Sequence, residues 1–209
     1  MYDNRHHLIL GFHGCDEETC QRLVNNPREF HFNKNSYDWL GNGMYFWENN
    51  LERACQWALE KQKQGKIKQP AVLGALIHPG NCCDFLNSKY TEQLAAYYVN
   101  LSKRLDNMPH NEDVKSDPHK DKLLRKLDCA VIEQMHREMS IEQEIERQKY
   151  GFVTRDTYDT VRCAFLEGAP AFPGAAIKLK NHIQICVRNP NSILAFFRPR
   201  LKPSSILAA

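Results

Sequence analysis

Three short stretches of this chain combine residue types that could bind a small molecule and act on it. Phe12-His13-Gly14 sets an imidazole beside a glycine, the run from Gly41 to Phe46 (GNGMYF) leads a glycine turn into an aromatic pair, and NHIQICVRNP carries Gln184 within an apolar pattern. Histidine and glutamine both donate and accept hydrogen bonds, and glycines permit backbone angles that other residues avoid. Taken singly, His13 and Tyr45 could equally be core residues, and Gln184 a polar residue on the exposed side of a strand.

Two common catalytic motifs are missing from the sequence. It has no Gly-x-Ser-x-Gly elbow, and its cysteines and histidines are plentiful without a pattern, which argues against a nucleophilic hydrolase. Gly41-Asn42-Gly43-Met44 lacks the further glycine and the Lys-Ser/Thr pair of a phosphate-binding loop.

The eight cysteines are scattered singly, which is typical of buried thiols in a reducing compartment. Cys82 and Cys83, with His78 and His110, could ligate a metal. Because no Cys-x-x-Cys partner accompanies them, we expect no metal site.

The elements that must position these stretches follow from apolar periodicity and turn residues. Asp16 is a good N-cap, Pro27 stops the helix that follows it, and Asn49-x-x-Glu52 resembles a capping box. We expect a single α+β domain over 1–209. The patterns predict strands at 7–13, 71–78, 160–165, 176–179, 182–187 and 193–197, and further helices at 49–64, 91–105 and 119–139.

In their order and context, the three stretches resemble the His-Tyr-Glu class of ADP-ribosyltransferases, which includes diphtheria toxin and the poly-ADP-ribose polymerases. In that class a first strand ends in His-Gly, matched by His13-Gly14, and a second carries Gly-x-Gly-Ile-Tyr-Phe before a helix, matched by the run from Gly41 to Phe46. A late strand opens with the catalytic glutamate. Setting Asn189-Pro190 against the turn that follows this strand places Gln184 at the glutamate position, which is the main departure from the class.

The resemblance implies a fold and a substrate. The fold is a split mixed or antiparallel β core with flanking helices, into which a helical segment at about 91–150 is inserted. The substrate is NAD. His13 would hydrogen-bond a ribose of NAD, the backbone of Gly14 would grip the carboxamide, and Tyr45 would stack on the nicotinamide ring.

Four further residues are candidates for the NAD site or for catalysis. Gly43 would let the backbone approach the dinucleotide, and Tyr37 could line the cleft. Trp57 could form a second aromatic wall or pack in the core. Because Gln184 cannot take up a proton as a carboxylate can, we expect transfer of a single ADP-ribose, with Glu167 as the substitute acid unless it is only an exposed loop residue.

The charge distribution bears on the acceptor. From Gly151 onward eight Lys or Arg face three acids, so this third carries about +5 against −2 for the rest. A basic surface suits a dinucleotide or nucleic acid but is also common as a solvated face. Arg155 and Arg162 could contact pyrophosphate or an anionic acceptor. We therefore slightly favour RNA or DNA over protein as the acceptor.

These features together predict an NAD-dependent mono-ADP-ribosyltransferase. Its compact size suits a bacterial toxin or an anti-phage effector. The expected partner is an inhibitory antitoxin-type protein. Two alternatives stay open: a catalytically silent ADP-ribose-binding module and an NAD glycohydrolase. No apolar run approaches the ~20 residues of a membrane helix, and the start lacks a signal pattern. We expect a cytoplasmic protein without a membrane partner.

Overall fold

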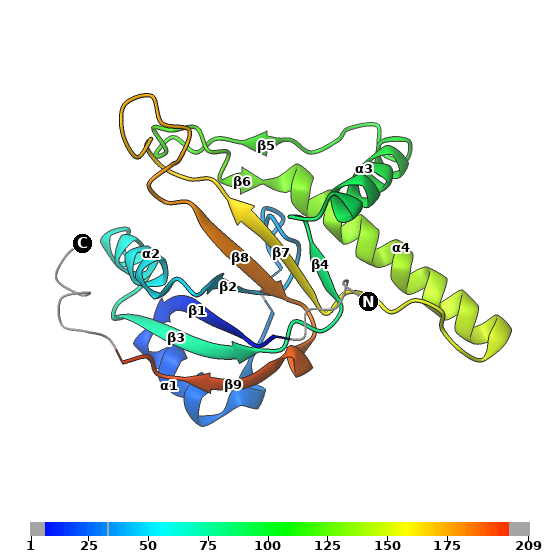
Figure 1. The fold of residues 1–209 in the computed structure, drawn as a ribbon, viewed down its shortest axis with the longest axis horizontal. Coiled ribbons are helices and arrows are strands. Elements are labelled where there is room, and N and C mark those ends of the chain that lie inside the picture. Colours follow the sequence, from blue (N-terminus) through cyan, green and yellow to red (C-terminus); the bar gives the residue numbers. More distant parts are fainter. Residues whose placement is uncertain (1–6, 33, 201–209) are drawn as a thin grey trace.

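A computed structural model describes residues 7–32 and 34–200. Its centre is a seven-stranded mixed sheet with the order β4-β7-β8-β2-β1-β3-β9, in which only β4 and β7 run parallel (Figure 1). The α+β class predicted from the sequence is therefore confirmed. The elements are β1 (Ile9–Asp16), α1 (Glu17–Asn25), η1 (Pro27–Glu29), β2 (Met44–Glu48), α2 (Leu51–Lys63), β3 (Pro70–Ile77), β4 (Cys82–Asp84), α3 (Ser88–Ser102), β5 (Asn111–Glu112), β6 (Leu124–Arg125), α4 (Lys126–Tyr150), β7 (Thr160–Phe165), β8 (His182–Val187), η2 (Pro190–Ser192) and β9 (Ile193–Phe197).

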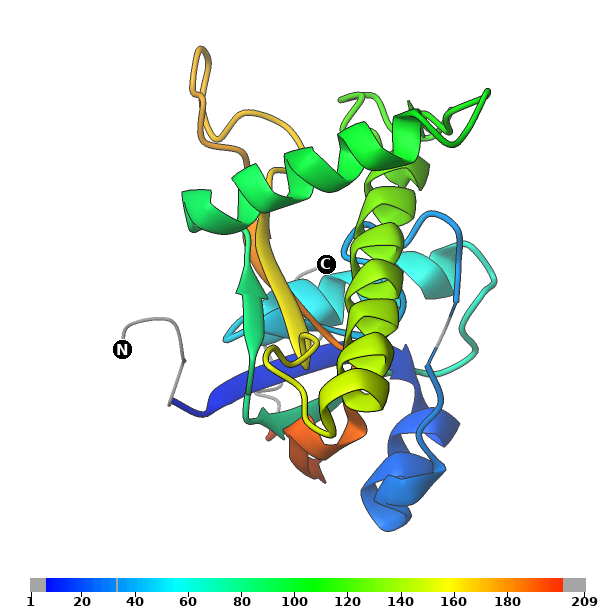
Figure 2. The same ribbon diagram turned by 90° about the vertical axis from the view of Figure 1, so that its right-hand side faces the viewer.

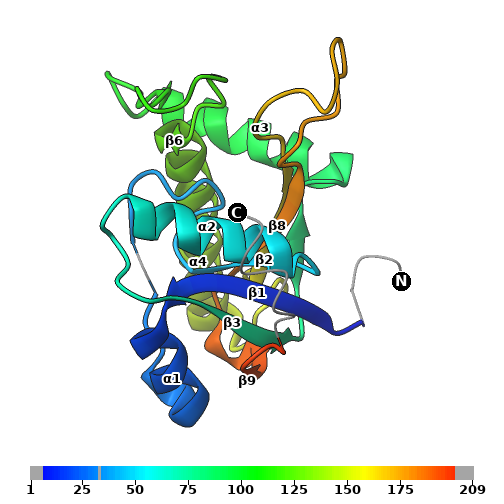
Figure 3. The same cartoon turned by 90° about the vertical axis from the view of Figure 1, so that its left-hand side faces the viewer.

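Helices α1 and α2 lie on opposite sides of β1 and β3 (Figure 3). Cys20 and Leu23 of α1 pack on Met44, Phe46 and the inner residues of β3. On the other face, Ala54 and Cys55 of α2 pack on Phe12, Trp47 and Val72. Successive residues of a strand point to opposite faces, so β1 and β2 each contribute to both cores.

The other end of the sheet is covered by α4, which α3 crosses (Figure 2). Ile132 and Met135 of α4 pack against Val161 of β7 and Cys186 of β8. In the chain, α3, the short β5–β6 pair and α4 all lie between β4 and β7. Tyr45 of β2 packs with the α4 cluster and Trp47, two residues further along, packs with the α2 cluster. Helices α4 and α2 therefore face the same side of the sheet, and they flank the strands that carry the motif residues.

Several predicted boundaries were wrong. The first strand begins at Ile9 and continues to Asp16, and α2 is capped by Asn50, whose side chain accepts from the Arg53 amide, rather than by Asn49. The long helix spans Lys126–Tyr150 instead of 119–139, ending at the left-handed Gly151. Residues 176–179 form no strand, since only an isolated bridge joins Lys178 to Pro170.

In the part of the chain that the structure describes, no helix is both long and apolar enough to cross a membrane.

Candidate functional site

The three motif strands are neighbours, in the order β8-β2-β1. Trp47 pairs with Phe12 on one side and with Gln184 on the other, and Tyr45 pairs with Cys186. Directly paired residues share a face of the sheet. Tyr45 and Gln184 therefore lie on the face between α2 and α4.

The pairing of β1 with β2 ends at Phe12, and the imidazole of His13 lies where the two strands separate. Its Nδ1 is 2.8 Å from the main-chain oxygen of Tyr45, and its ring centroid is 5.9 Å from that of Phe46. A carbonyl oxygen can only accept, so Nδ1 carries the proton. Burial lowers the pKa of His13, against the effect of this hydrogen bond. The neutral ring therefore keeps an acceptor lone pair on Nε2.

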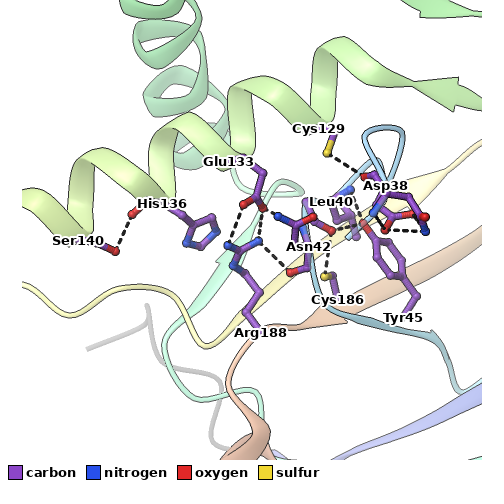
Figure 4. Close-up of polar contacts among 12 residues, drawn as sticks. Asp38, Leu40, Asn42, Tyr45, Cys129, Glu133, His136, Ser140, Cys186 and Arg188 are labelled. Atoms are coloured by element: carbon purple, nitrogen blue, oxygen red, sulfur yellow. Dashed lines mark hydrogen bonds and ion pairs between the residues drawn. The ribbon is translucent and has the colours of Figure 1, made fainter. Parts of the chain in front are cut away.

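Tyr45 uses its hydroxyl to close the turn that precedes its own strand. The hydroxyl donates to the Gly41 carbonyl at 2.7 Å and accepts from the Leu40 amide at 2.8 Å (Figure 4). Burial raises the pKa of Tyr45 far above its ordinary value, so the phenol stays protonated. The hydroxyl thus has a structural role. The ring is partly buried and packs against the cluster under α4 that includes Leu40 and Ile132, so only its remaining exposed part is open to a ligand.

Helix α4 holds the same turn from its other side. Glu133 accepts from the Asn42 amide at 2.8 Å and pairs with Arg188 at 2.5 Å, and Arg188 also donates to the Asn42 carbonyl at 2.9 Å (Figure 4). Burial acts to raise the pKa of Glu133, but the hydrogen bond and charge of Arg188, together with the Asn42 amide and His136, lower this pKa on balance. Gly41 has φ +80°, and a Cβ there would meet Glu133 at 2.5 Å. Glycine is therefore needed for the close approach of α4.

Gln184 is oriented by an indole. Its Oε1 accepts from Nε1 of Trp39 at 2.6 Å, which fixes the amide because an indole N–H can only donate. Among the described residues, the amide nitrogen of Gln184 has no hydrogen bond. The group that Gln184 presents is therefore an N–H donor.

A row of rings crosses the face between α2 and α4, and sequence reasoning missed most of it. Ring centroids are 5.9 Å apart for Trp57 and Trp47, 6.0 Å for Trp47 and His182, 5.5 Å for the stacked His182 and Phe165, and 4.9 Å for Phe165 and Trp39. Aromatic faces and edges suit a planar heterocycle. No sequence spacing reveals this row, because its members come from α2, β2, β8, β7 and the loop before β2.

Two guanidinium groups lie against this row of rings. Arg53 is 5.7 Å from the Trp47 centroid, and Arg125 is 4.1 Å from Phe165 and 5.2 Å from Trp39. All three distances are within cation–π range. Burial lowers the pKa of Arg125, but a guanidinium remains charged at neutral pH. The face combines rings with fixed positive charge, which suits a nucleotide.

Glu167 is brought to this face, but its carboxylate is engaged. Both oxygens accept from Nη2 of Arg53, at 3.1 and 3.0 Å. Trp57 is also present, with its ring 6.5 Å from that of His13. Glu167 could act as a base only after leaving Arg53.

The two candidate arginine contacts from the sequence are not brought together. Arg162 is buried, and its guanidinium binds Glu48 and Asp84, with distances of 2.5 Å and 3.1 Å. The N–H groups of Arg162 already donate to these two carboxylates, which corrects the expectation of a phosphate contact. Arg155 is exposed and lines a cavity of about 600 Å³ beside α3 and α4, together with Tyr97 and Tyr158.

The glycines and Tyr37 have more ordinary surroundings than the sequence implied. A Cβ at Gly14 would lie 2.6 Å from the Ala54 oxygen of α2, and one at Gly43 would lie 2.5 Å from Cys186 of β8. Both positions need glycine because neighbouring elements pack closely on them. Tyr37 is 43% exposed, in a turn before β2.

No group of three or more His, Cys, Asp or Glu within residues 7–32 and 34–200 is arranged to hold a metal ion. No protein-family model matches the chain, and neither a curated protein nor a solved structure shows detectable similarity to it.

Proposed function

We propose that the protein transfers a single ADP-ribose from NAD to a macromolecular acceptor. The observation that carries the proposal is the contact between His13 and the Tyr45 carbonyl, where β1 separates from β2 beside the strand of Gln184. Together with the strand order β8-β2-β1, this contact means that His13, Tyr45 and Gln184 lie on neighbouring strands. This placement supports the proposal, whose chemistry rests on the resemblance to ADP-ribosyltransferases. The row of rings and guanidinium groups around Gln184 adds a surface suited to a dinucleotide.

The reaction breaks the bond between nicotinamide and ribose and forms a bond from C1′ of the ribose to an acceptor oxygen or nitrogen. Nicotinamide leaves with the bonding electrons, and the acceptor loses a proton. The transition state resembles an oxocarbenium ion, so the protein must mainly hold the dinucleotide and its leaving group in place. Nε2 of His13 would accept from a ribose hydroxyl, and the Tyr45 ring would stack on nicotinamide, worth about 1 kcal/mol beyond burial.

Gln184 limits what the site can do. Its amide can donate to a ribose oxygen, but it cannot take the acceptor's proton. Glu167 could take that proton only after leaving Arg53. This arrangement fits one slow transfer better than chain elongation, and it also favours the second candidate function, a module that binds ADP-ribose without chemistry.

The positive charge after Gly151 supports a nucleic-acid acceptor less strongly than the sequence implied. Of the basic residues after Gly151, Arg162 is buried, and four others pair with carboxylates: Lys178, Lys180, Arg188 and Arg198. Lys202 lies outside the described residues. Because so much positive charge is compensated, RNA, DNA and protein acceptors must be tested side by side. A role as a bacterial toxin or anti-phage effector, with an inhibitory partner, belongs to the same proposal.

The test is incubation of the purified protein with NAD labelled on the adenylate phosphate, alone and with RNA, DNA or cell lysate. Nicotinamide release and label transfer are followed together. We expect both, with transfer requiring an acceptor. Release without any acceptor would instead show an NAD glycohydrolase, and ADP-ribose binding without release would show a silent module.

A further inference from the structure

Arg53 and Trp47 hold three buried N–H groups that have no hydrogen-bond partner among the residues the structure describes. They are Nε and Nη1 of Arg53 and Nε1 of Trp47. The Arg53 side chain is 5% exposed and Trp47 is 4% exposed, and the guanidinium lies 5.7 Å from the indole centroid. Buried N–H groups in proteins nearly always have acceptors. Three donors without a hydrogen bond on two neighbouring side chains point to an acceptor that a ligand supplies.

The charges around these donors favour an anion. Glu167 binds only Nη2 of Arg53, and Glu60 lies 3.8 Å from Nη1 while pairing with Lys180 at 2.8 Å. Lys61 lies over the Trp57 ring at 5.0 Å. Three cations thus face two carboxylates. The net positive charge and the donors without a hydrogen bond together match a group that carries negative charge and several acceptor oxygens.

We propose that Arg53 and Trp47 bind the diphosphate of a nucleotide, an inference that rests on the proposed function for the identity of that nucleotide as NAD. A planar guanidinium matches phosphate oxygens in geometry as well as charge. The indole that lies 5.7 Å from the guanidinium adds an N–H donor of its own. Glu167 is then a competitor that occupies part of the same guanidinium, and the diphosphate must displace it.

The segment that carries Glu167 can move without opening a core. This connection between β7 and β8 projects from the body (Figure 1), and its large apolar side chains are mostly exposed: Leu166, Phe172, Ile177 and Leu179. Polar contacts hold it, including Lys178 with Asp121 and Lys180 with Glu60. Displacing Glu167 therefore breaks its ion pair with Arg53 and strains these polar contacts, but it exposes little apolar surface.

The test is calorimetric titration of the full chain with ADP and, separately, with adenosine. We expect Arg53→Gln to weaken ADP binding about tenfold to a hundredfold, as loss of charge-assisted hydrogen bonds implies, with adenosine binding unchanged. Glu167→Gln should tighten ADP binding, because it removes the competitor. Arg147→Gln is the matched control: Arg147 pairs with Glu144 on the α4 surface at 3.1 Å, and its loss should change neither titration.

Two further variants keep the result interpretable if Arg53→Gln unfolds. Arg53→Lys keeps the charge without the fork, and Arg53→Gln with Glu167→Gln leaves no unpaired carboxylate; both should still bind ADP more weakly than the wild type. The site would be overturned if ADP binding did not depend on Arg53. It would also be overturned if Arg53 were needed to bind a single-stranded oligonucleotide but not to bind ADP. Nicotinamide release with ADP binding independent of Arg53 would remove this inference alone. Arg53-dependent ADP binding without nicotinamide release would keep the site and remove the transferase proposal.

Discussion

Nδ1 of His13 donates to the main-chain oxygen of Tyr45 at 2.8 Å, across the point where β1 and β2 stop pairing. The two residues are 32 positions apart in the chain. The contact fixes the ring of His13 and its tautomer, because the carbonyl can only accept. A neutral imidazole with a free Nε2 is thereby held beside the strand that carries Tyr45.

Tyr45→Phe separates the hydroxyl of Tyr45 from its ring. The variant leaves the Leu40 amide without its acceptor and leaves the Gly41 carbonyl only the weak Cys186 thiol donor, so we expect the free energy of unfolding to fall by about 1–3 kcal/mol. Nicotinamide release should persist in Tyr45→Phe and be lost in Tyr45→Ala, which removes the ring. Urea denaturation and the NAD assay measure the two effects. Equal loss of release in both variants would show that the hydroxyl itself acts on the substrate.

Arg162→Met should unfold the protein far more easily than Arg155→Met. Arg162 is buried between Glu48 and Asp84, and removing one partner of a buried ion pair costs about 3–5 kcal/mol. Arg155 is exposed, so its substitution should change stability by no more than about 0.5 kcal/mol. Chemical denaturation of both variants measures this difference. Similar stabilities would contradict the structural role of Arg162.

Glu133 and Arg188 form a clamp that joins α4 to the turn at Asn42. A double-mutant cycle of Glu133→Gln and Arg188→Gln tests this clamp. Both side chains are largely shielded, with 23% and 17% exposed, and Glu133 also holds the Asn42 amide. We expect a coupling energy of about 1–2 kcal/mol in urea denaturation. The same cycle on Arg147 and Glu144, exposed on α4, should give less than about 0.5 kcal/mol. Equal coupling in the two pairs would mean that the turn does not depend on this clamp.

Acid should destabilise the fold through His136. Burial, and then Arg188, lower the pKa of His136 to about 3, whereas the unfolded chain titrates near the ordinary 6.5. The unfolded state therefore binds the proton first, so the stability contributed by neutral His136 is complete above pH 6.5 and is lost as the pH falls below it. One such group gives a slope of up to about 1.4 kcal/mol per pH unit.

The measurement is the free energy of unfolding between pH 5.5 and 7.5. His136→Gln should flatten the fall at the acid end, while the exposed His110→Gln should follow the wild type. A wild-type slope in His136→Gln would show that other groups cause the acid sensitivity. His13 and His182, whose pKa values burial also lowers, should account for what remains of the slope.

The strands were predictable where apolar runs end at turn residues. The predicted ranges 160–165, 182–187 and 193–197 coincide with β7, β8 and β9. Helix α4 was misplaced at both ends, because its last turns carry exposed polar helix formers with no apolar period, and its start adjoins the short β5–β6 pair. The glycine turn signalled unusual backbone geometry, but nothing local could show that α4 packs against it.

The candidate site was predictable only in the residues that form contiguous motifs. His13, Tyr45 and Gln184 are found on neighbouring strands. Arg53, Arg125 and His182 were not found from the sequence, because each is isolated in its own element and gains meaning only from rings contributed by other elements. Burial of Arg162 was equally hidden, since its two carboxylate partners lie 114 and 78 positions away.

The most direct test of the account is the initial rate of nicotinamide release from NAD by the wild type and by His13→Ala, with circular dichroism showing that both are folded. We predict release by the wild type and a loss of about a hundredfold or more in His13→Ala, because a group that orients the reacting ribose acts in the transition state. No release by the folded wild type with any acceptor, or equal rates for the two proteins, would contradict the proposed activity and its site.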